Sequence, residues 1–373
     1  MVAKIIMESE TEHIYERLRQ HFNQGETTKL RKTKELMEIL EILFSPEQVD
    51  YATDLPLTVL GRISAENLAK KMDKDALQVE VMLENMAGEG KILATTSRKD
   101  GKKYYSLFPL IPGILESTYA DGIDNDQRQR LSALVEKYHG DALGPEIGSS
   151  KYPIFRIIPI NEKVDSGSQA LPFEEAANMV NGADVITVIP CLCRTVSKKC
   201  NHIMEADFVF GAWADYLIKY RGARKWTKEE AMKRLKECEE DGLLHITGNA
   251  QEGSAVMCNC CPCCCNALRN LTEHHNPRAF VRSNFEPRVD HEMCILCMQC
   301  QDVCPMGAIR ELPGYEADGS DTRMFVEESQ CVGCGLCSSH CPADAIRMVK
   351  VRNYLPVKSL AEMNAQFFKE KIL

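Results

Sequence analysis

Two cysteine runs near the C-terminus constrain this chain more than any other feature. Each run has the spacing Cys-x2-Cys-x2-Cys-x3-Cys-Pro, and the second begins 37 positions after the first. Steps of three residues let a tight loop place three thiolates around one face of a metal cluster, whereas the fourth cysteine faces a neighbouring cluster. The proline that follows has a fixed φ and no N–H, which suits a chain turning into a new helix. The runs are Cys294, Cys297, Cys300 and Cys304, followed by Cys331, Cys334, Cys337 and Cys341.

These runs belong to a set of 18 cysteines in 373 residues, and the chemistry of the thiols depends on the compartment. The first residues contain no apolar run behind a basic start, so we expect no secretory signal. No stretch approaches the roughly 18 uncharged apolar residues of a membrane helix. These features predict a cytoplasmic protein without a membrane span, in which thiols stay reduced. Clustered cysteines in that setting indicate metal ligands rather than disulfides.

The segment that contains both runs resembles the two-cluster bacterial-type ferredoxins, over roughly the last 80 residues. The resemblance implies two [4Fe–4S] clusters with crossed ligation, each of which carries one electron. One cluster would be bound by Cys294, Cys297, Cys300 and Cys341, and the other by Cys331, Cys334, Cys337 and Cys304. The alternative is a zinc module with paired Cys-x2-Cys knuckles, but this spacing is not a zinc pattern.

Two residues of the first cysteine loop are large where the second loop has glycine. Leu296 and Met298 stand in the first loop where the second loop has Gly333 and Gly335. Because these side chains are large and apolar, we expect the first cluster to lie in a drier and more crowded pocket. Neither difference removes a ligand.

Residues 1–120 contain no cysteine and are predicted to form helices followed by a hairpin. Apolar residues recur at helical spacing within Leu30–Leu43, and Ser64 and Asp73 can cap two further helices. An Asp-Gly pair between two strand-like runs indicates a tight hairpin. This order resembles a winged-helix domain, which implies either DNA binding or protein docking. The segment is slightly acidic and favours docking; DNA binding would use Arg98, Lys99, Lys102 and Lys103 on the hairpin.

Residues 121–290 are predicted to form a cysteine-rich α/β unit. Pro153–Ile160 and Val185–Pro190 are short apolar runs. Leu171–Val180 between them looks helical, so we expect a strand–helix–strand unit with a parallel pair. A capping box at Thr227 begins a further helix.

The last predicted unit, residues 291–373, contains the ferredoxin-like segment and an apolar tail. The tail is expected to dock as a helix through Leu360, Met363, Phe367 and Phe368. The predicted fold class is therefore a multidomain α+β protein, with boundaries near residues 120 and 290.

Ten cysteines lie outside the two runs. Cys238 falls at helical spacing with apolar residues, so we expect a core thiol. The other nine form two groups, the first of which directly follows the predicted strand at residues 185–190. Open α/β sheets place ligands at the carboxyl ends of such strands. We predict that the nine are metal ligands: Cys191, Cys193, Cys200, Cys258, Cys260, Cys261, Cys263, Cys264 and Cys265.

Three interpretations of these nine thiols are open. They bind one or two further [4Fe–4S] clusters drawn from both groups, which we favour, or one structural zinc that ties the groups together, or they form an open cluster or redox dithiol. Arg194 either stabilises thiolate charge beside Cys193 or forms a surface salt bridge. The region from about Ile154 to Leu268 is similar to a cysteine-rich module of iron–sulfur proteins from anaerobic microbes, which implies a redox context without a defined reaction. A related pattern has a further cysteine where this chain has Asp207.

Motifs of other activities are absent from the sequence. No glycine-rich nucleotide motif follows a predicted strand, and no pair of nucleophile and base stands out. We therefore predict an electron carrier or oxidoreductase subunit rather than a stand-alone enzyme. It would pass single electrons through [4Fe–4S] clusters between redox partner proteins, in an anaerobic oxidoreductase system. The alternatives are a redox- or iron-sensing winged-helix transcription regulator, which the net charge of −9 disfavours, and a terminal reductase with an open middle cluster.

Overall fold

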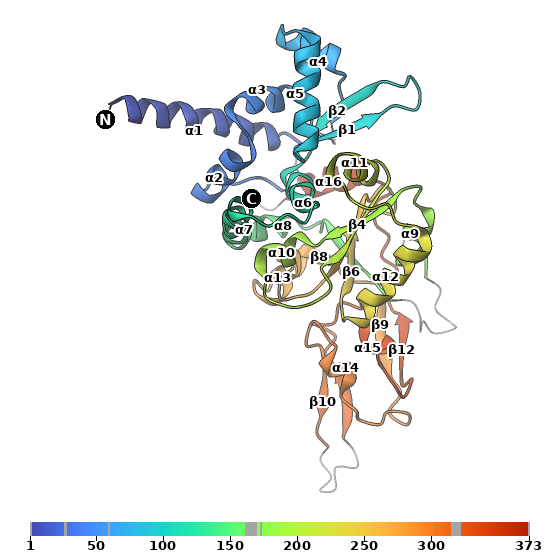
Figure 1. Cartoon of the computed structure of the whole chain (residues 1–373). Helices are drawn as coiled ribbons and strands as arrows, with labels where there is room; N and C mark the ends of the chain where they lie inside the picture. The colour runs from blue at the N-terminus through green and yellow to red at the C-terminus, as the bar shows by residue number, and fades with distance from the viewer. Residues whose placement is uncertain are drawn as a thin grey trace.

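The computed structural model describes residues 2–25, 28–58, 60–160, 170–171, 174–314 and 322–371. Its fold is mixed α+β, as predicted (Figure 1). Helices gather at the N-terminal end, a six-stranded sheet occupies the centre, and two-stranded sheets lie at the opposite end with the C-terminal cysteine runs. In the described part of the chain, no helix is long and apolar enough to cross a membrane.

The N-terminal part consists of helices followed by a β-hairpin. In chain order its elements are α1 (Val2–Phe22), α2 (Lys34–Leu43), α3 (Pro46–Asp54), α4 (Ala65–Met72), α5 (Ala76–Gly88), β1 (Ile92–Thr96) and β2 (Lys103–Leu107). The two strands pair antiparallel, with Thr96 opposite Lys103 at the turn. Gly101 has a positive φ of 69° in that turn. The hairpin predicted from the Asp-Gly pair is therefore confirmed.

Side-chain caps begin the helices of this part, because their oxygens accept hydrogen bonds from unpaired N–H groups of the first turn. Ser64 caps α4 as predicted. The cap predicted at Asp73 is wrong. Asp73 ends α4 in the left-handed conformation, with a φ of 52°, and Asp75 caps α5 instead. On α5, Leu77 and Val81 are exposed, and the buried face consists of Val79, Leu83, Met86 and Ala87.

The central sheet has the strand order β4–β5–β7–β6–β3–β8. The strands are β3 (Phe155–Ile158), β4 (Ile186–Pro190), β5 (Glu205–Phe210), β6 (Leu244–Gly248), β7 (Val256–Cys260) and β8 (Phe280–Val281). The predicted pairing of β3 with β4 is wrong, because three strands lie between them. Among the described pairs, only β3 and β8 are parallel. A short loop joins β6 to β7, and only antiparallel strands can be connected so tightly.

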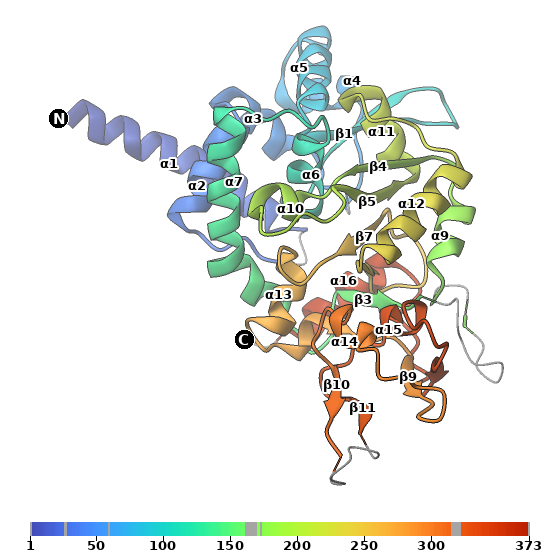
Figure 2. The same ribbon diagram turned by 60° about the horizontal axis from the view of Figure 1, so that its bottom comes forward.

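Helices cover both faces of the sheet (Figure 2). The helices of this part are α6 (Leu115–Tyr119), α7 (Asp126–Tyr138), α8 (Gly144–Ile147), α9 (Ala176–Gly182), α10 (Leu192–Ser197), α11 (Gly211–Arg221), α12 (Lys228–Glu240) and α13 (Asn266–Thr272). On one face, α9 and α12 share a core with Val188 and Phe208. On the other face, α6, α10 and α11 share a core with Ile189 and Val209.

Two helix predictions concern these covering helices. The capping box is confirmed, because Thr227 and Glu230 exchange hydrogen bonds at the start of α12. The helix predicted over Leu171–Val180 corresponds to α9, which begins only at Ala176. Residues 172–173 of that prediction lie outside the described residues.

Strand directions bring the middle cysteines together. β5 lies between β4 and β7 and is antiparallel to both, so β4 and β7 run in the same direction. Their carboxyl ends therefore lie at one edge of the sheet, where Cys191 follows β4 and Cys261 follows β7. Cys200 precedes β5, whose first residue lies at the same edge. Cysteines that are distant in sequence thus meet at one place.

Two antiparallel strand pairs flank the C-terminal cysteine runs. The elements are β9 (Phe285–Val289), α14 (Gln299–Asp302), β10 (Ile309–Leu312), β11 (Arg323–Val326), α15 (Leu336–Ser339) and β12 (Ile346–Lys350). β9 pairs with β12, and β10 pairs with β11. The two halves of this part share one equivalent backbone hydrogen bond. Asp290 N–H donates to Ala345 O in one half, and Glu327 N–H donates to Ala308 O in the other. Because β9 precedes residue 291, this strand pairing begins before the predicted domain boundary.

The tail forms α16 (Leu360–Lys369), and its predicted docking as a helix is confirmed. The docking role predicted for Phe368 is wrong, because that side chain is exposed. Met363 and Phe367 are buried, and Ser150 Oγ donates a hydrogen bond of 2.9 Å to Phe367 O. A Cβ on Gly248, at the end of β6, would lie 3.0 Å from Leu360. The C-terminal helix therefore packs against the central part of the chain.

Phe367→Ala is expected to lower the free energy of unfolding by about 3–5 kcal/mol, the usual cost of an aromatic-to-alanine cavity in a core. Phe368→Ala is the matched control and should cost much less, because Phe368 is 38% exposed whereas Phe367 is 0% exposed. Urea unfolding of anaerobic protein, followed by circular dichroism, measures both. Equal losses in the two variants would contradict the docking.

Candidate metal centres

Two cavities lie among the cysteines of the C-terminal part. The first is lined by Cys294, Cys297, Cys300 and Cys341. The second is lined by Cys331, Cys334, Cys337 and Cys304. Each cavity thus combines the three loop cysteines of one run with the last cysteine of the other, and apolar residues form the remaining walls. Four thiols in an apolar cavity fit a [4Fe–4S] cluster. The groupings are those that the ferredoxin resemblance implies, and the ligation by each thiol stays a prediction.

In both halves of the C-terminal part, the sulfur of the last cysteine of the run accepts a hydrogen bond from a backbone N–H group. Ala308 N–H donates to Cys304 Sγ at 3.2 Å, and Ala345 N–H donates to Cys341 Sγ at 3.3 Å. Such N–H groups stabilise negative charge on sulfur and raise the reduction potential of a bound cluster. Burial raises the pKa of Cys334 to about 12, so that thiol is protonated at neutral pH without metal. Metal binding at this cavity must therefore release protons.

The two loops differ in exposure, in the direction opposite to the prediction. In the first loop Cys297 is exposed, and Ile295 is 66% exposed. In the second loop Cys331 is buried, and Cys334 O accepts a hydrogen bond of 2.9 Å from Ile160 N–H. The first loop is therefore the more exposed one, contrary to the expectation, because the second loop packs against the middle of the chain. The first cavity is nonetheless the more crowded, as expected, with a volume of about 330 Å³ against about 370 Å³ for the second.

Close backbone packing explains the two glycines of the second loop. Gly333 has a φ of 71°, and a Cβ there would overlap the first carbonyl oxygen of β9. Gly335 has a φ of 85°, and its Cβ would lie 2.8 Å from Ile160 O. Leu296 and Met298 also have positive φ angles, of 52° and 64°. Their conformation costs roughly 1–2 kcal/mol each. Both side chains are partly buried and pack against the apolar cluster around the first cavity.

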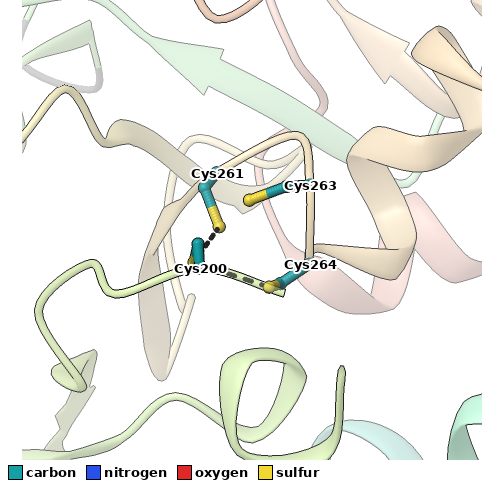
Figure 3. Close-up of side chains that lie close together, drawn as sticks. All are labelled: Cys200, Cys261, Cys263 and Cys264. Carbon is teal, nitrogen blue, oxygen red and sulfur yellow. Dashed lines mark hydrogen bonds between the residues drawn. The ribbon is translucent and has the colours of Figure 1, made fainter. Parts of the chain in front are cut away.

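Four further thiols meet at the edge of the central sheet (Figure 3). The four-cysteine group consists of Cys200, Cys261, Cys263 and Cys264, whose sulfur atoms all lie within 4.8 Å of one another. The Cys200 sulfur lies 3.7 Å from that of Cys261 and 3.6 Å from that of Cys264. A tetrahedral ion bound by thiolates at about 2.3 Å separates the sulfurs by about 3.8 Å. The group therefore has the spacing of a site for one metal ion.

The other five middle cysteines form a second cluster of thiols. This five-cysteine group consists of Cys191, Cys193, Cys258, Cys260 and Cys265. Its thiols interact in a chain, because Cys193 contacts Cys191 and Cys265, and Cys260 contacts Cys265 and Cys258. Hydrogen bonds from Cys193 and Cys260 lower the pKa of Cys265 to about 6. Cys265 is therefore the most acidic thiol of this group.

The side chains of β7 point alternately to the two faces of the sheet, and this separates the two groups of cysteines. Cys258 and Cys260 face one side of the strand, and Met257 belongs to the core under α12 on the other side. Cys261 continues on the α12 side, where it packs with Cys238, which is buried as predicted. Proximity in sequence places Cys200 with Cys191 and Cys193. The structure instead brings it to Cys261, Cys263 and Cys264.

Arg194 lies between the two groups. Its side chain is 2% exposed, and Nη1 donates to Asn259 O at 3.0 Å and to Cys261 Sγ at 3.8 Å. The alternative prediction of a surface salt bridge is wrong. Its Nε and Nη2 have no hydrogen-bond partner among the described residues, and neither does Oδ1 of Asp207.

Asp207 is a buried residue that the sequence analysis did not assign to a site. It lies on β5 opposite Ile189 and Cys258, so its side chain faces the five-cysteine group. Burial raises its pKa, although Arg194 and the nearby thiols act in the opposite direction. The signal in the sequence is an aspartate inside an otherwise apolar strand, which is uncommon without a partner or a ligand.

Residues 287–348 match the family model of a 4Fe-4S dicluster domain. The match spans both C-terminal runs and both cavities, so this part of the chain is a dicluster ferredoxin domain, which implies two [4Fe–4S] clusters. No curated protein matches the chain. The family match does not reach the cysteines of the middle of the chain, so their candidate metal sites are assigned from the arrangement of the side chains.

Gly333→Ala is expected to prevent assembly of the second cavity, because the added methyl group has no space beside β9. The chain should then lose about four iron and four sulfide, the content of one [4Fe–4S] cluster. Leu296→Ala, the change at the equivalent position of the exposed loop, should retain them. Iron and acid-labile sulfide per anaerobically purified chain measure the difference. A full iron content in Gly333→Ala would contradict the packing argument.

Proposed function

We propose that the protein passes single electrons between redox partner proteins, as a component of an anaerobic oxidoreductase system. The observation that carries this proposal is the pair of four-thiol cavities within one dicluster domain. A [4Fe–4S] cluster, when bound, supplies a reversible one-electron step. The two cavities are neighbours, since Cys300, Cys304, Cys337 and Cys341 belong to one apolar cluster. We assign the crossed cysteine sets as the ligands.

The difference in exposure supports a direction for the electron path. The lining of the first cavity includes the exposed residues Cys297 and Ile295, so a partner protein can approach it closely. The second cavity faces inward, where Leu336 and Val332 join the core of the middle part. Electrons would therefore be exchanged with one partner at the first cavity and pass inward through the second.

The four-cysteine group would bind one structural zinc ion. Its sulfur spacing suits a tetrahedral ion, and zinc binds thiolates more tightly than ferrous iron does. The ion would join the segment before β5 to the segment after β7. This is the zinc interpretation of the sequence, now restricted to Cys200, Cys261, Cys263 and Cys264.

The proposed organisation has three units, at residues 1–120, 121–290 and 291–373, with the first unit as a winged-helix-like docking module. A bridge between Ile63 and Tyr105 adds a short third segment to the hairpin, as in a winged helix. Helix α5, just before the hairpin, contains no lysine or arginine and exposes Leu77 and Val81. These features support protein docking rather than the DNA binding of a transcription regulator.

The electron-transfer proposal is tested by titration of anaerobically purified protein with dithionite. Each bound cluster should take up one electron and return it to oxidised cytochrome c, without turnover of a small molecule. Cys294→Ser with Cys297→Ser should remove one cluster and about one electron of capacity. Cys238→Ser, which changes a buried thiol outside the cavities, is the control and should behave as wild type. The proposal is wrong if protein with its full iron content cannot reduce the acceptor.

The exposure difference predicts an order of oxidative damage. A brief treatment with ferricyanide should attack the first cavity before the second, because Cys297 is exposed whereas Cys331 is buried. Electron paramagnetic resonance during a time course separates the two losses, and the Cys294→Ser, Cys297→Ser variant identifies the signal of the first cavity. Loss of both signals at the same rate would contradict the proposed outer and inner order.

A further inference from the structure

The five-cysteine group has the features of a site of its own. Its thiols come from three places: the segment after β4, strand β7 and the start of α13. Cys191, Cys260 and Cys265 are at most 5% exposed, and none of the five forms a disulfide. Five reduced thiols that interact in a chain inside a core are more than packing requires, since an apolar side chain fills the same volume without a reactive group.

Two buried charged side chains beside these thiols have unpartnered atoms. Arg194 retains three N–H bonds without an acceptor, on Nε and Nη2, and Asp207 retains a free carboxylate oxygen. The residues are 2% and 4% exposed, so neither side chain is in contact with bulk solvent. Leaving such groups unpaired in a core is costly. The charged and polar neighbours that act on Arg194 are Cys191, Asp207, Cys260 and Cys261.

The spacing of the thiols distinguishes this group from a site for a single ion. Among the described cysteines, the four-cysteine group is the one set whose sulfurs all lie within 4.8 Å of one another. The five-cysteine group does not meet that spacing, and neither do the two sets of the dicluster domain. A more open arrangement of thiols suits several metal ions bridged by sulfide. In this spacing the five-cysteine group is like the two cysteine sets of the dicluster domain and unlike the four-cysteine group.

We propose that the five-cysteine group binds a third [4Fe–4S] cluster through four of its thiols, with Arg194 as the cation that balances the cluster's charge. This inference rests on the proposed electron-transfer function, which it extends inward. Cys260 and Cys265 belong to the same continuous core as Val332 and Leu336 of the second ferredoxin loop. The third cluster would exchange its one electron with the dicluster domain across that core. It is distinct from the zinc at the four-cysteine group.

The test is the iron, sulfide and zinc content per full chain after anaerobic purification. Wild type should contain about 12 iron, 12 sulfide and one zinc, since each [4Fe–4S] cluster holds four of each. Cys193→Ser with Cys265→Ser should retain about 8 iron and the zinc. Cys263→Ser with Cys264→Ser should lose the zinc and keep about 12 iron. Cys238→Ser is the matched buried-thiol control and should equal wild type.

Each alternative outcome overturns a different statement. About 8 iron in wild type, or an unchanged 12 iron in Cys193→Ser with Cys265→Ser, overturns the third cluster and leaves the electron-transfer proposal standing. Fewer than about 4 iron in wild type overturns the electron-transfer proposal itself. A single iron in place of zinc, lost from Cys263→Ser with Cys264→Ser, keeps the one-ion geometry and overturns the zinc assignment.

A second variant keeps the proposal testable if the cysteine variant does not fold. Arg194→Gln retains all five thiols and removes the buried positive charge. A reduced cluster carries one more negative charge than an oxidised one, so this variant should lower one of three midpoint potentials in an anaerobic redox titration. The two potentials of the dicluster domain should not move. A uniform shift of all potentials, or none, would contradict a role for Arg194 beside a third cluster.

Discussion

Thiolate ligands must converge on one point, and in the middle of this chain the central sheet makes them converge. β4 and β7 end at the same edge because β5 runs antiparallel between them. The alternation of β7 then sends Cys258 and Cys260 to one face and Cys261 to the other. A nearly continuous run of cysteines is thereby divided between the four-cysteine group and the five-cysteine group. In the C-terminal runs, three-residue spacing within one tight loop achieves the same convergence without a sheet.

Packing of the dicluster domain against the rest of the protein makes its two halves unequal. The second loop lies so close to β9 and to Ile160 that only glycine fits at two of its positions. The first loop faces solvent, where Leu296 and Met298 adopt the same left-handed backbone. A nearly symmetric repeat in sequence thus becomes an outer and an inner cavity. That polarity supports the electron path that we propose between a partner protein and the interior.

Predictions that depend on a few neighbouring residues agree with the structure. The Asp-Gly hairpin, the capping box at Thr227 and the cap at Ser64 each involve hydrogen bonds within about four residues. Predictions that depend on distant segments agree less often, although the docking of the C-terminal helix was confirmed. β3 and β4 do not pair, because three strands lie between them, and the cysteine loop expected to be the drier one is the more exposed one. The predicted N-cap at Asp73 was wrong by two residues, because Asp75 has the same side chain and caps α5 instead.

The sequence by itself determined the chemistry of this protein: two ferredoxin runs, ten further thiols and the local elements that present them. Ligand spacing within a loop is a local property, so it can be read from the order of residues. Only the tertiary structure decided which middle thiols meet, because sheet order and strand direction depend on interactions across the whole chain. It also placed Arg194 and Asp207 in the core between them. No local sequence pattern predicts the burial of Arg194 and Asp207, because it results from the packing of elements that are far apart in sequence.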